Sequence, residues 1–135
     1  MEIMEKITVG ACREETMTVG VQHTAQALGS GSLPVFGTPA MTALMEKAAT
    51  NLAQELLPEG WTSVGTALNI EHLAATPVGA AVRAMATVEA LEGRRVSYKV
   101  EAFDDAGLIG RGTHDRVAVE AEKFLAKAQD KLNKK

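Results

Sequence analysis

The spacing of apolar residues changes from helical to alternating at Gly60, and this change restricts the fold more than any other feature. Before it, apolar residues recur at helical spacing and form one stripe, which consists of Met41, Leu44, Met45, Ala48, Leu52 and Leu56. Thr38-Pro39 is typical of a helix start, with Thr38 as the N-cap and the proline at the first helical position. We therefore predict one long helix that begins at Thr38-Pro39 and ends at Pro58.

After Gly60 the apolar residues alternate with polar ones, which is the pattern of half-buried strands. Strands are expected over residues 64–72, 80–91, 95–104 and 108–119, with tight turns between them. Two short strands, 7–12 and 15–21, are expected before the long helix, and an amphipathic helix over 119–131 follows the last strand. Because tight turns join antiparallel neighbours, the order predicts an α+β fold in which an antiparallel sheet wraps around the helix. Such a layer leaves sheet edges and one helix flank uncovered, which favours a homodimer.

Composition excludes several classes of function. The chain of 135 residues fits a single domain, 1–135, and its formal net charge of −3 argues against a nucleic-acid binder. No apolar run approaches the roughly 18–20 residues of a membrane span, so we expect no membrane contact. The one cysteine, Cys12, forms no disulfide within the chain, which suits the cytoplasm, and we expect a buried or half-buried structural thiol. No cluster of residues has metal-ligand spacing, so no metal is expected.

Three side chains stand out as candidates for chemistry: the hydroxyl of Thr38, the carboxylate of Glu46 and the imidazole of His72. Together they could supply a nucleophile and its activating partners, which is what hydrolysis of an activated acyl compound requires. Each also has a structural interpretation: Thr38 as a helix cap, Glu46 as a solvated helix residue, and His72 as a hydrogen-bonded histidine on the inward face of its strand. His23 and His114 are further candidates, and His114 is interpreted as a packing or interface residue.

Four sequence blocks resemble one known family in order and approximate spacing. They are VFGTPAMTALMEKA from Val35, SVGTALNIEHLAATPVG from Ser63, EGRRVSYKVEAFDD from Glu92, and GRGTHDR from Gly110, followed by EKFLAK. The chain is similar to the fluoroacetyl-CoA thioesterase-like branch of the hotdog fold. This resemblance implies an antiparallel sheet around one central helix, with a C-terminal helix.

The resemblance also implies a site and a partner. In that family a threonine at the helix start, a glutamate two turns later and a histidine at the end of the next strand are catalytic, and these positions hold Thr38, Glu46 and His72. Gly65 matches a glycine whose backbone approaches the acyl group, and Arg116 matches an arginine that organises the site or binds the CoA portion. The expected substrate is an acyl-CoA, no separate cofactor is implied, and the expected assembly is a homodimer, or a higher oligomer, with sites at the subunit interface.

The expected activity is hydrolysis of an acyl-CoA thioester to a free acid and CoA. Two alternatives remain open from the sequence: a non-catalytic module that binds or senses acyl-CoA, and a hotdog hydratase or dehydratase. Fluoroacetyl-selective members resemble one another in aromatic residues before the helix, whereas this chain has Gly29, Ser30, Gly31, Ser32 and Leu33 there. The sequence therefore does not predict fluoroacetyl selectivity, and it leaves the preferred acyl group undetermined.

Overall fold

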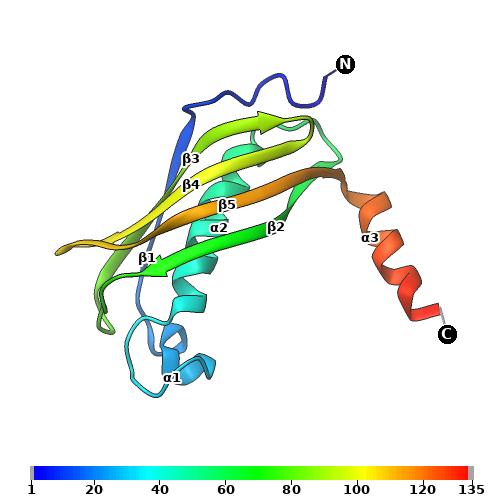
Figure 1. The fold of residues 1–135 in the computed structure, drawn as a ribbon. Coiled ribbons are helices and arrows are strands. Elements are labelled where there is room, and N and C mark those ends of the chain that lie inside the picture. Colours follow the sequence, from blue (N-terminus) through cyan, green and yellow to red (C-terminus); the bar gives the residue numbers. More distant parts are fainter. Residues whose placement is uncertain (1, 134–135) are drawn as a thin grey trace.

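A curved five-stranded antiparallel sheet surrounds one long helix in the computed structural model, which describes residues 2–133 (Figure 1). The strands are β1 (Cys12–Thr18), β2 (Trp61–His72), β3 (Ala81–Glu92), β4 (Arg95–Asp104) and β5 (Gly107–Glu120). Their order in the sheet is β1-β3-β4-β5-β2, so β1 and β2 form the two edges. The long helix is α2 (Thr38–Gln54), and the predicted α+β hotdog architecture is confirmed.

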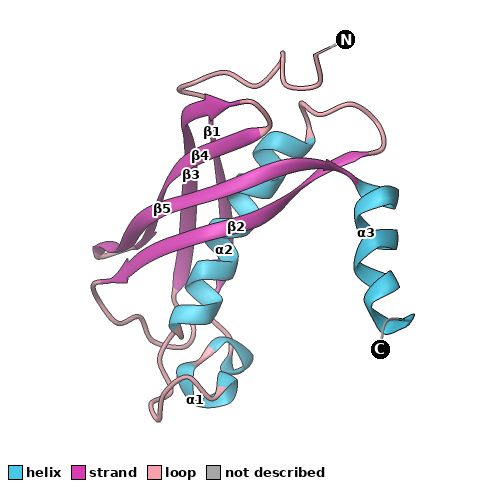
Figure 2. Ribbon diagram, turned by 45° about the vertical axis from the view of Figure 1, so that its right-hand side comes forward, coloured by secondary structure: helices cyan, strands magenta, loops and turns pink. Residues whose placement is uncertain are grey.

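Shorter elements flank this layer on two sides (Figure 2). A 3-10 turn, η1 (Val21–His23), and the one-turn helix α1 (Ala25–Leu28) lie between β1 and α2. Helix α3 (Ala121–Gln129) follows β5 directly and ends in a second 3-10 turn, η2 (Asp130–Asn133). Figure 2 shows α3 projecting away from the sheet, and none of its residues is buried.

Aliphatic side chains from α2 and the sheet form the core, as the two hydrophobic periods predict. On α2 the buried residues are Met41, Leu44, Met45, Ala48, Ala49, Leu52 and Ala53. The facing residues of β3 and β4 are Val82, Ala84, Ala86 and Val88, and Val96, Tyr98, Val100 and Ala102. Because the helical stripe meets the inward face of consecutive strands, α2 is held over the centre of the sheet with its N-terminus close to the end of β2.

The N-terminal predictions need correction. Residues 7–11 form no strand, because Gly10 adopts a positive φ of 94° and the chain turns there. One strand, β1, replaces the two predicted over 7–12 and 15–21, and it pairs with β3 alone. Cys12 starts this strand and is exposed, so the expectation of a buried or half-buried thiol is wrong.

Strand β2 contains an irregularity that the alternating pattern does not reveal. Its pairing with β5 shifts register between Gly65 and Ala67, which leaves Thr66 as a bulge. A bulge adds one residue to a strand. If odd-numbered residues face the helix before the bulge, even-numbered residues therefore face it after the bulge. Gly65 therefore shares the helix-facing side with Leu68 and His72, although their residue numbers differ in parity. Uninterrupted alternation over the predicted strand 64–72 would place Val64 and Thr66 on the face of His72, and the bulge is the reason why they do not lie there.

Candidate active site

The start of α2 and the end of β2 bring Thr38 and His72 into direct contact. Gly37, not Thr38, occupies the N-cap position of α2, so the threonine is the first helical residue and its side chain caps nothing. Its Oγ1 instead lies 2.8 Å from Nδ1 of His72. The helix-cap interpretation of Thr38 is therefore wrong, and the hydroxyl is free to act with an imidazole.

The environment of His72 favours its neutral form. Burial lowers the pKa of this imidazole below its ordinary value, and a backbone group of Ala74 opposes the shift. Its second ring nitrogen, Nε2, is buried and has no hydrogen-bond partner among the described residues. A neutral imidazole whose Nδ1 faces a hydroxyl group is suited to accept the proton of that hydroxyl.

Thr38 and His72 lie at the wall of a cavity of about 330 Å³. The cavity extends along the segment after β2 and along the loop before α2, and it is lined by Ala25, Ser30, Val35, Phe36, Thr38, His72, Leu73, Ala74 and Ala75. No side chain of this lining carries a permanent charge. Small and apolar walls fit an uncharged group better than a phosphate or a carboxylate.

Glu46 belongs to a second cluster, farther along α2. Its Oε2 lies 3.4 Å from Nη1 of Arg116 and 3.7 Å from Nε2 of His114, both of which come from β5. The Glu46 side chain keeps 38% of its surface exposed, while the two partner side chains are almost wholly buried. A cavity of about 200 Å³ opens beside it, lined by Glu46, Gly65, Thr66, Ala67, Leu68 and His114.

Ser63 holds the Arg116 guanidinium in place with two hydrogen bonds. Its Nε donates to Oγ of Ser63 at 2.8 Å, and its Nη2 donates to the Ser63 carbonyl oxygen at 2.9 Å. Burial lowers the pKa of Arg116, and Glu46 opposes this shift, but a guanidinium stays charged in proteins. The buried cation therefore presents a fixed positive charge to the Glu46 carboxylate.

Gly65 leaves open the space directly over this cluster. A Cβ atom at this position would lie 3.0 Å from Oε2 of Glu46, 3.1 Å from Cε1 of His114 and 3.3 Å from Nη1 of Arg116. Any larger residue would press on the carboxylate. The absence of a side chain gives a ligand access to both the carboxylate and the strand backbone.

A single chain does not bring the three predicted residues together. Thr38 and Glu46 are eight positions apart on α2, a rise of about 12 Å, which is well beyond hydrogen-bond reach. They line different cavities, with His72 beside Thr38 and His114 and Arg116 beside Glu46. Sequence reasoning missed Ser63 as the anchor of Arg116 and gave His114 only a packing or interface role. His23 is used locally, since its Nδ1 accepts the Gly20 N–H.

Other kinds of site find no support within residues 2–133. No group of three or more His, Cys, Asp or Glu residues in this part of the chain is arranged to hold a metal ion. Among the helices of residues 2–133, none combines the length and the apolar composition of a membrane span.

A curved antiparallel sheet around one long helix is the hotdog fold, and this chain places a hydroxyl–imidazole pair at the start of that helix. Residues 19–122 match the family model described as fluoroacetyl-CoA-specific thioesterase. A fluoroacetyl-CoA thioesterase of Streptantibioticus cattleyicolor is 43% identical over 97 residues, which cover 72% of this chain and 70% of that protein. The chain belongs to this thioesterase family, so the predicted family is confirmed.

Solved structures agree with this assignment. A mutant of the fluoroacetyl-CoA-specific thioesterase, in complex with fluoroacetate and CoA, superposes with a TM-score of 0.83 at 35% identity, covering 87% of this chain and 99% of that one. A hot-dog-like protein from Thermanaerovibrio acidaminovorans superposes with a TM-score of 0.87 at 29% identity, covering 97% of both chains. The prediction of a thioesterase is thus confirmed at the level of the family.

Proposed function

We propose that this protein hydrolyses an acyl-CoA thioester to the free acid and CoA, with Thr38, Glu46 and His72 as its catalytic residues. The observation that carries the proposal is the 2.8 Å contact between Thr38 Oγ1 and His72 Nδ1 at the wall of an uncharged cavity. Membership of a thioesterase family and a related structure that holds CoA support the substrate class.

The residues suit the chemistry of a thioester. Nδ1 of His72 accepts a proton from Thr38 Oγ1, or from a water beside it, as that oxygen attacks the acyl carbon. The new C–O bond makes a tetrahedral oxyanion, which collapses with loss of the C–S bond. The leaving thiolate takes up the proton held by His72. With the threonine as nucleophile, an acyl-Thr38 ester forms and water then hydrolyses it.

Backbone groups at the start of α2 supply an oxyanion site. Pro39 has no N–H, and the N–H of Met41 donates to the Gly37 carbonyl oxygen at 3.0 Å. Thr38 and Ala40 therefore provide the N–H groups of the first turn that can meet an oxyanion, and the helix dipole favours negative charge there. One such donor is worth roughly 10²–10³ in rate.

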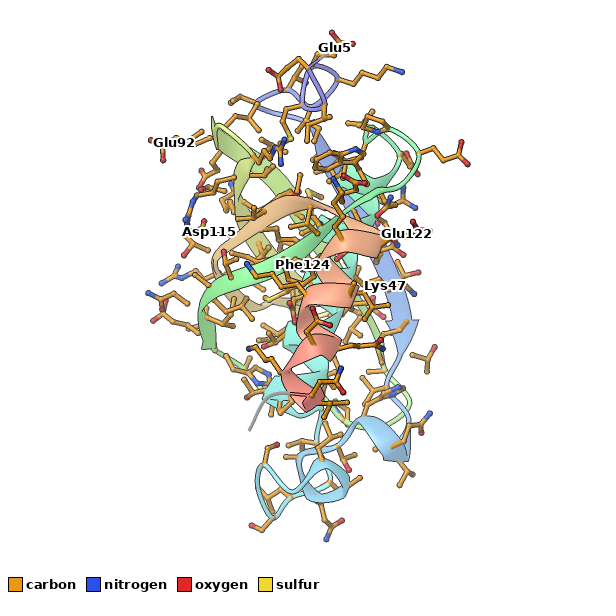
Figure 3. All side chains as sticks on the ribbon, turned by 90° about the vertical axis from the view of Figure 1, so that its right-hand side faces the viewer. Glu5, Lys47, Glu92, Asp115, Glu122 and Phe124 are labelled. Carbon is orange, nitrogen blue, oxygen red and sulfur yellow. The ribbon has the colours of Figure 1, made fainter. Side chains whose placement is uncertain are left out.

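A homodimer completes the site. Strand β2 forms a sheet edge of 12 residues, and its Leu68 side chain is 43% exposed. An open edge of this length is suited to pair with the same strand of a second copy. The exposed apolar side chains of α3, which include Phe124 in Figure 3, support further association.

Antiparallel pairing of two β2 strands brings Glu46 of one subunit close to Thr38 and His72 of the other. Gly65 lies beside Glu46, whereas His72 ends the same strand. In a two-fold arrangement about a point near Leu68, His72 of one chain lies across from Gly65 of the partner subunit. The partner then contributes Glu46, with Arg116 behind it, to the cavity that holds Thr38 and His72. Each dimer has two such sites.

The loop before α2 leads us to propose an acyl specificity that is not restricted to fluoroacetyl. Residues 29–33 contain no aromatic side chain that could close over a two-carbon acyl group. We expect kcat/KM for fluoroacetyl-CoA to exceed that for acetyl-CoA by less than about tenfold, the factor that 1.4 kcal/mol of discrimination gives. A larger ratio would show that the selectivity arises without these aromatics.

A thiol-release assay tests the proposal directly. Purified protein is incubated with short, medium, branched and aromatic acyl-CoAs, and free CoA is followed. Hydrolysis that falls by roughly 10²–10⁴ in Glu46→Gln and His72→Ala is the expected result. Saturable binding without release would instead identify a binding module, and a change in enoyl absorbance without release a hydratase. Mass spectrometry of quenched enzyme distinguishes an acyl-Thr38 ester from direct attack by water.

A further inference from the structure

The hydrogen bonds of His114 leave only one arrangement of its protons. Nδ1 lies 2.9 Å from the carbonyl oxygen of Ala67, which can only accept, so Nδ1 carries the hydrogen. Nε2 lies 3.1 Å from Nη1 of Arg116, which can only donate. Nε2 must therefore be an unprotonated acceptor, and the ring is the neutral Nδ1–H tautomer.

The surroundings of His114 maintain this neutral state. The residue is 1% exposed. Burial, and then the charge of Arg116, lowers the pKa of the His114 imidazole, against the effects of the Ala67 carbonyl, Glu46 and Asp115. On β4, Tyr98 stacks against the ring with centroids 6.2 Å apart. Burial raises the pKa of Tyr98 to about 12, so the phenol adds no charge at neutral pH.

The acceptor on His114 matters because it controls one nitrogen of Arg116. Ser63 already holds Nε and Nη2 of the guanidinium. The remaining Nη1 has two acceptors, His114 Nε2 at 3.1 Å and Glu46 Oε2 at 3.4 Å. Three fixed nitrogens leave the guanidinium a single orientation, and the carboxylate is placed against it.

We propose that His114 is a positioning residue of the hydrolytic site: its Nε2 lone pair holds Nη1 of Arg116 and thereby fixes the Glu46 carboxylate for catalysis. This role rests on the catalytic function proposed for Glu46. A proton on Nε2 would place two donors face to face, repel Arg116 and attract Oε2 of Glu46, which is 3.7 Å away. The carboxylate would then leave its place on the guanidinium.

Two substitutions distinguish the effect of the hydrogen-bond acceptor of His114 from the effect of its ring volume. His114→Phe keeps an aromatic ring without an acceptor, and we expect kcat to fall by about 10- to 100-fold with KM changed less than threefold, because a hydrogen bond to a charged group is lost. His114→Gln restores a carbonyl acceptor for Arg116 and should keep kcat within about fivefold of the wild type. Tyr98→Phe is the matched control, since it removes from the same buried cluster a hydroxyl that has no hydrogen-bond partner among the described residues, and its kcat should not change.

The pH dependence of kcat/KM tests the proposal further, because substitution of His114 would not change it if the residue had only a structural role. Protonation of His114 inactivates the enzyme at low pH, so it contributes one proton to the slope of log(kcat/KM) against pH on the acid side. In His114→Gln this slope should be smaller by one proton. The proposal is overturned if folded His114→Phe keeps the wild-type kcat, if His114→Gln is as impaired as His114→Phe, or if the steepness is unchanged. Should His114→Phe fail to fold, the His114→Gln profile decides alone. A wild type that hydrolyses no acyl-CoA, or a fully active Glu46→Gln, would refute the proposed function instead.

Discussion

The functional interest of Thr38 comes from the residue that precedes it. Because Gly37 takes the N-cap position, the threonine hydroxyl is not needed to cap the helix and is available to His72. Sequence alone could place Thr38 at the helix start but could not decide between these positions, since threonine and glycine both serve as caps. If the helix began one residue later, the Thr38 hydroxyl would be a helix cap. Because Gly37 is the N-cap, the hydroxyl is a candidate nucleophile instead.

At the residue scale, the pH profile of hydrolysis reports on His72. Its imidazole must be neutral to accept a proton, and its pKa is lowered from 6.5 by burial. We therefore expect kcat/KM to stay constant at neutral pH and to fall only below pH 6.5, as the ring becomes protonated. A stopped-assay profile from pH 4.5 to 8 measures this. In His72→Ala the acid limb of the residual rate should be less steep by the one proton of His72, and a wild-type midpoint above 6.5 would contradict the assignment.

At the element scale, the sequence predicted the long helix, four of the strands and the inward faces of β3 and β4 well, because their apolar residues are regularly spaced. It did not predict the cluster of Ser63, His114 and Arg116, because that cluster depends on the register between β2 and β5. The bulge at Thr66 sets this register, and no apolar residue marks it. A hydrophobic pattern contains no information about a residue that belongs to neither face.

Two glycines on paired strands should respond differently to alanine. In Gly65→Ala the new methyl group lies nearest to Oε2 of Glu46, the end of a flexible side chain that can swing aside, with His114 and Arg116 slightly farther away. We expect about 1 kcal/mol or less of lost stability and at least a tenfold loss of kcat. In Gly112→Ala the methyl group falls on the backbone carbonyl oxygen of Asn69, which cannot move independently. That variant should lose about 1–3 kcal/mol or more.

Thermal unfolding and steady-state kinetics on the same two preparations measure the contrast. If Gly65→Ala unfolds at a lower temperature but keeps the wild-type kcat per folded molecule, the space above the Glu46 carboxylate has no role in hydrolysis.

At the scale of the whole molecule, the separation of Glu46 from Thr38 makes an unusual prediction about mixed dimers. Thr38→Ala and Glu46→Gln should each be nearly inactive. When they are unfolded and refolded together, each mixed dimer regains one site with Thr38 and His72 from one subunit and Glu46 from the other. Random mixing gives about a quarter of the wild-type activity.

A matched mixture provides the control. Thr38→Ala refolded with His72→Ala should regain nothing, because both residues of the contacting pair come from the same chain. Sedimentation establishes that dimers form in both mixtures. Inactive mixtures of Thr38→Ala and Glu46→Gln, with dimers present, would show that Glu46 does not act across the interface.

The extra residue at Thr66 has a consequence for how this strand can change. Point substitutions along β2 alter one side chain at a time, whereas deletion of Thr66 would leave a regular ladder, because Gly65 and Ala67 already pair with the neighbouring residues Arg116 and Asp115 of β5. Ser63 and His72 would keep their faces, but β2 would lose the local bend and added twist that a bulge gives a strand. The extra residue therefore affects the curvature of β2 between the two catalytic clusters, and not the choice of which side chains face them.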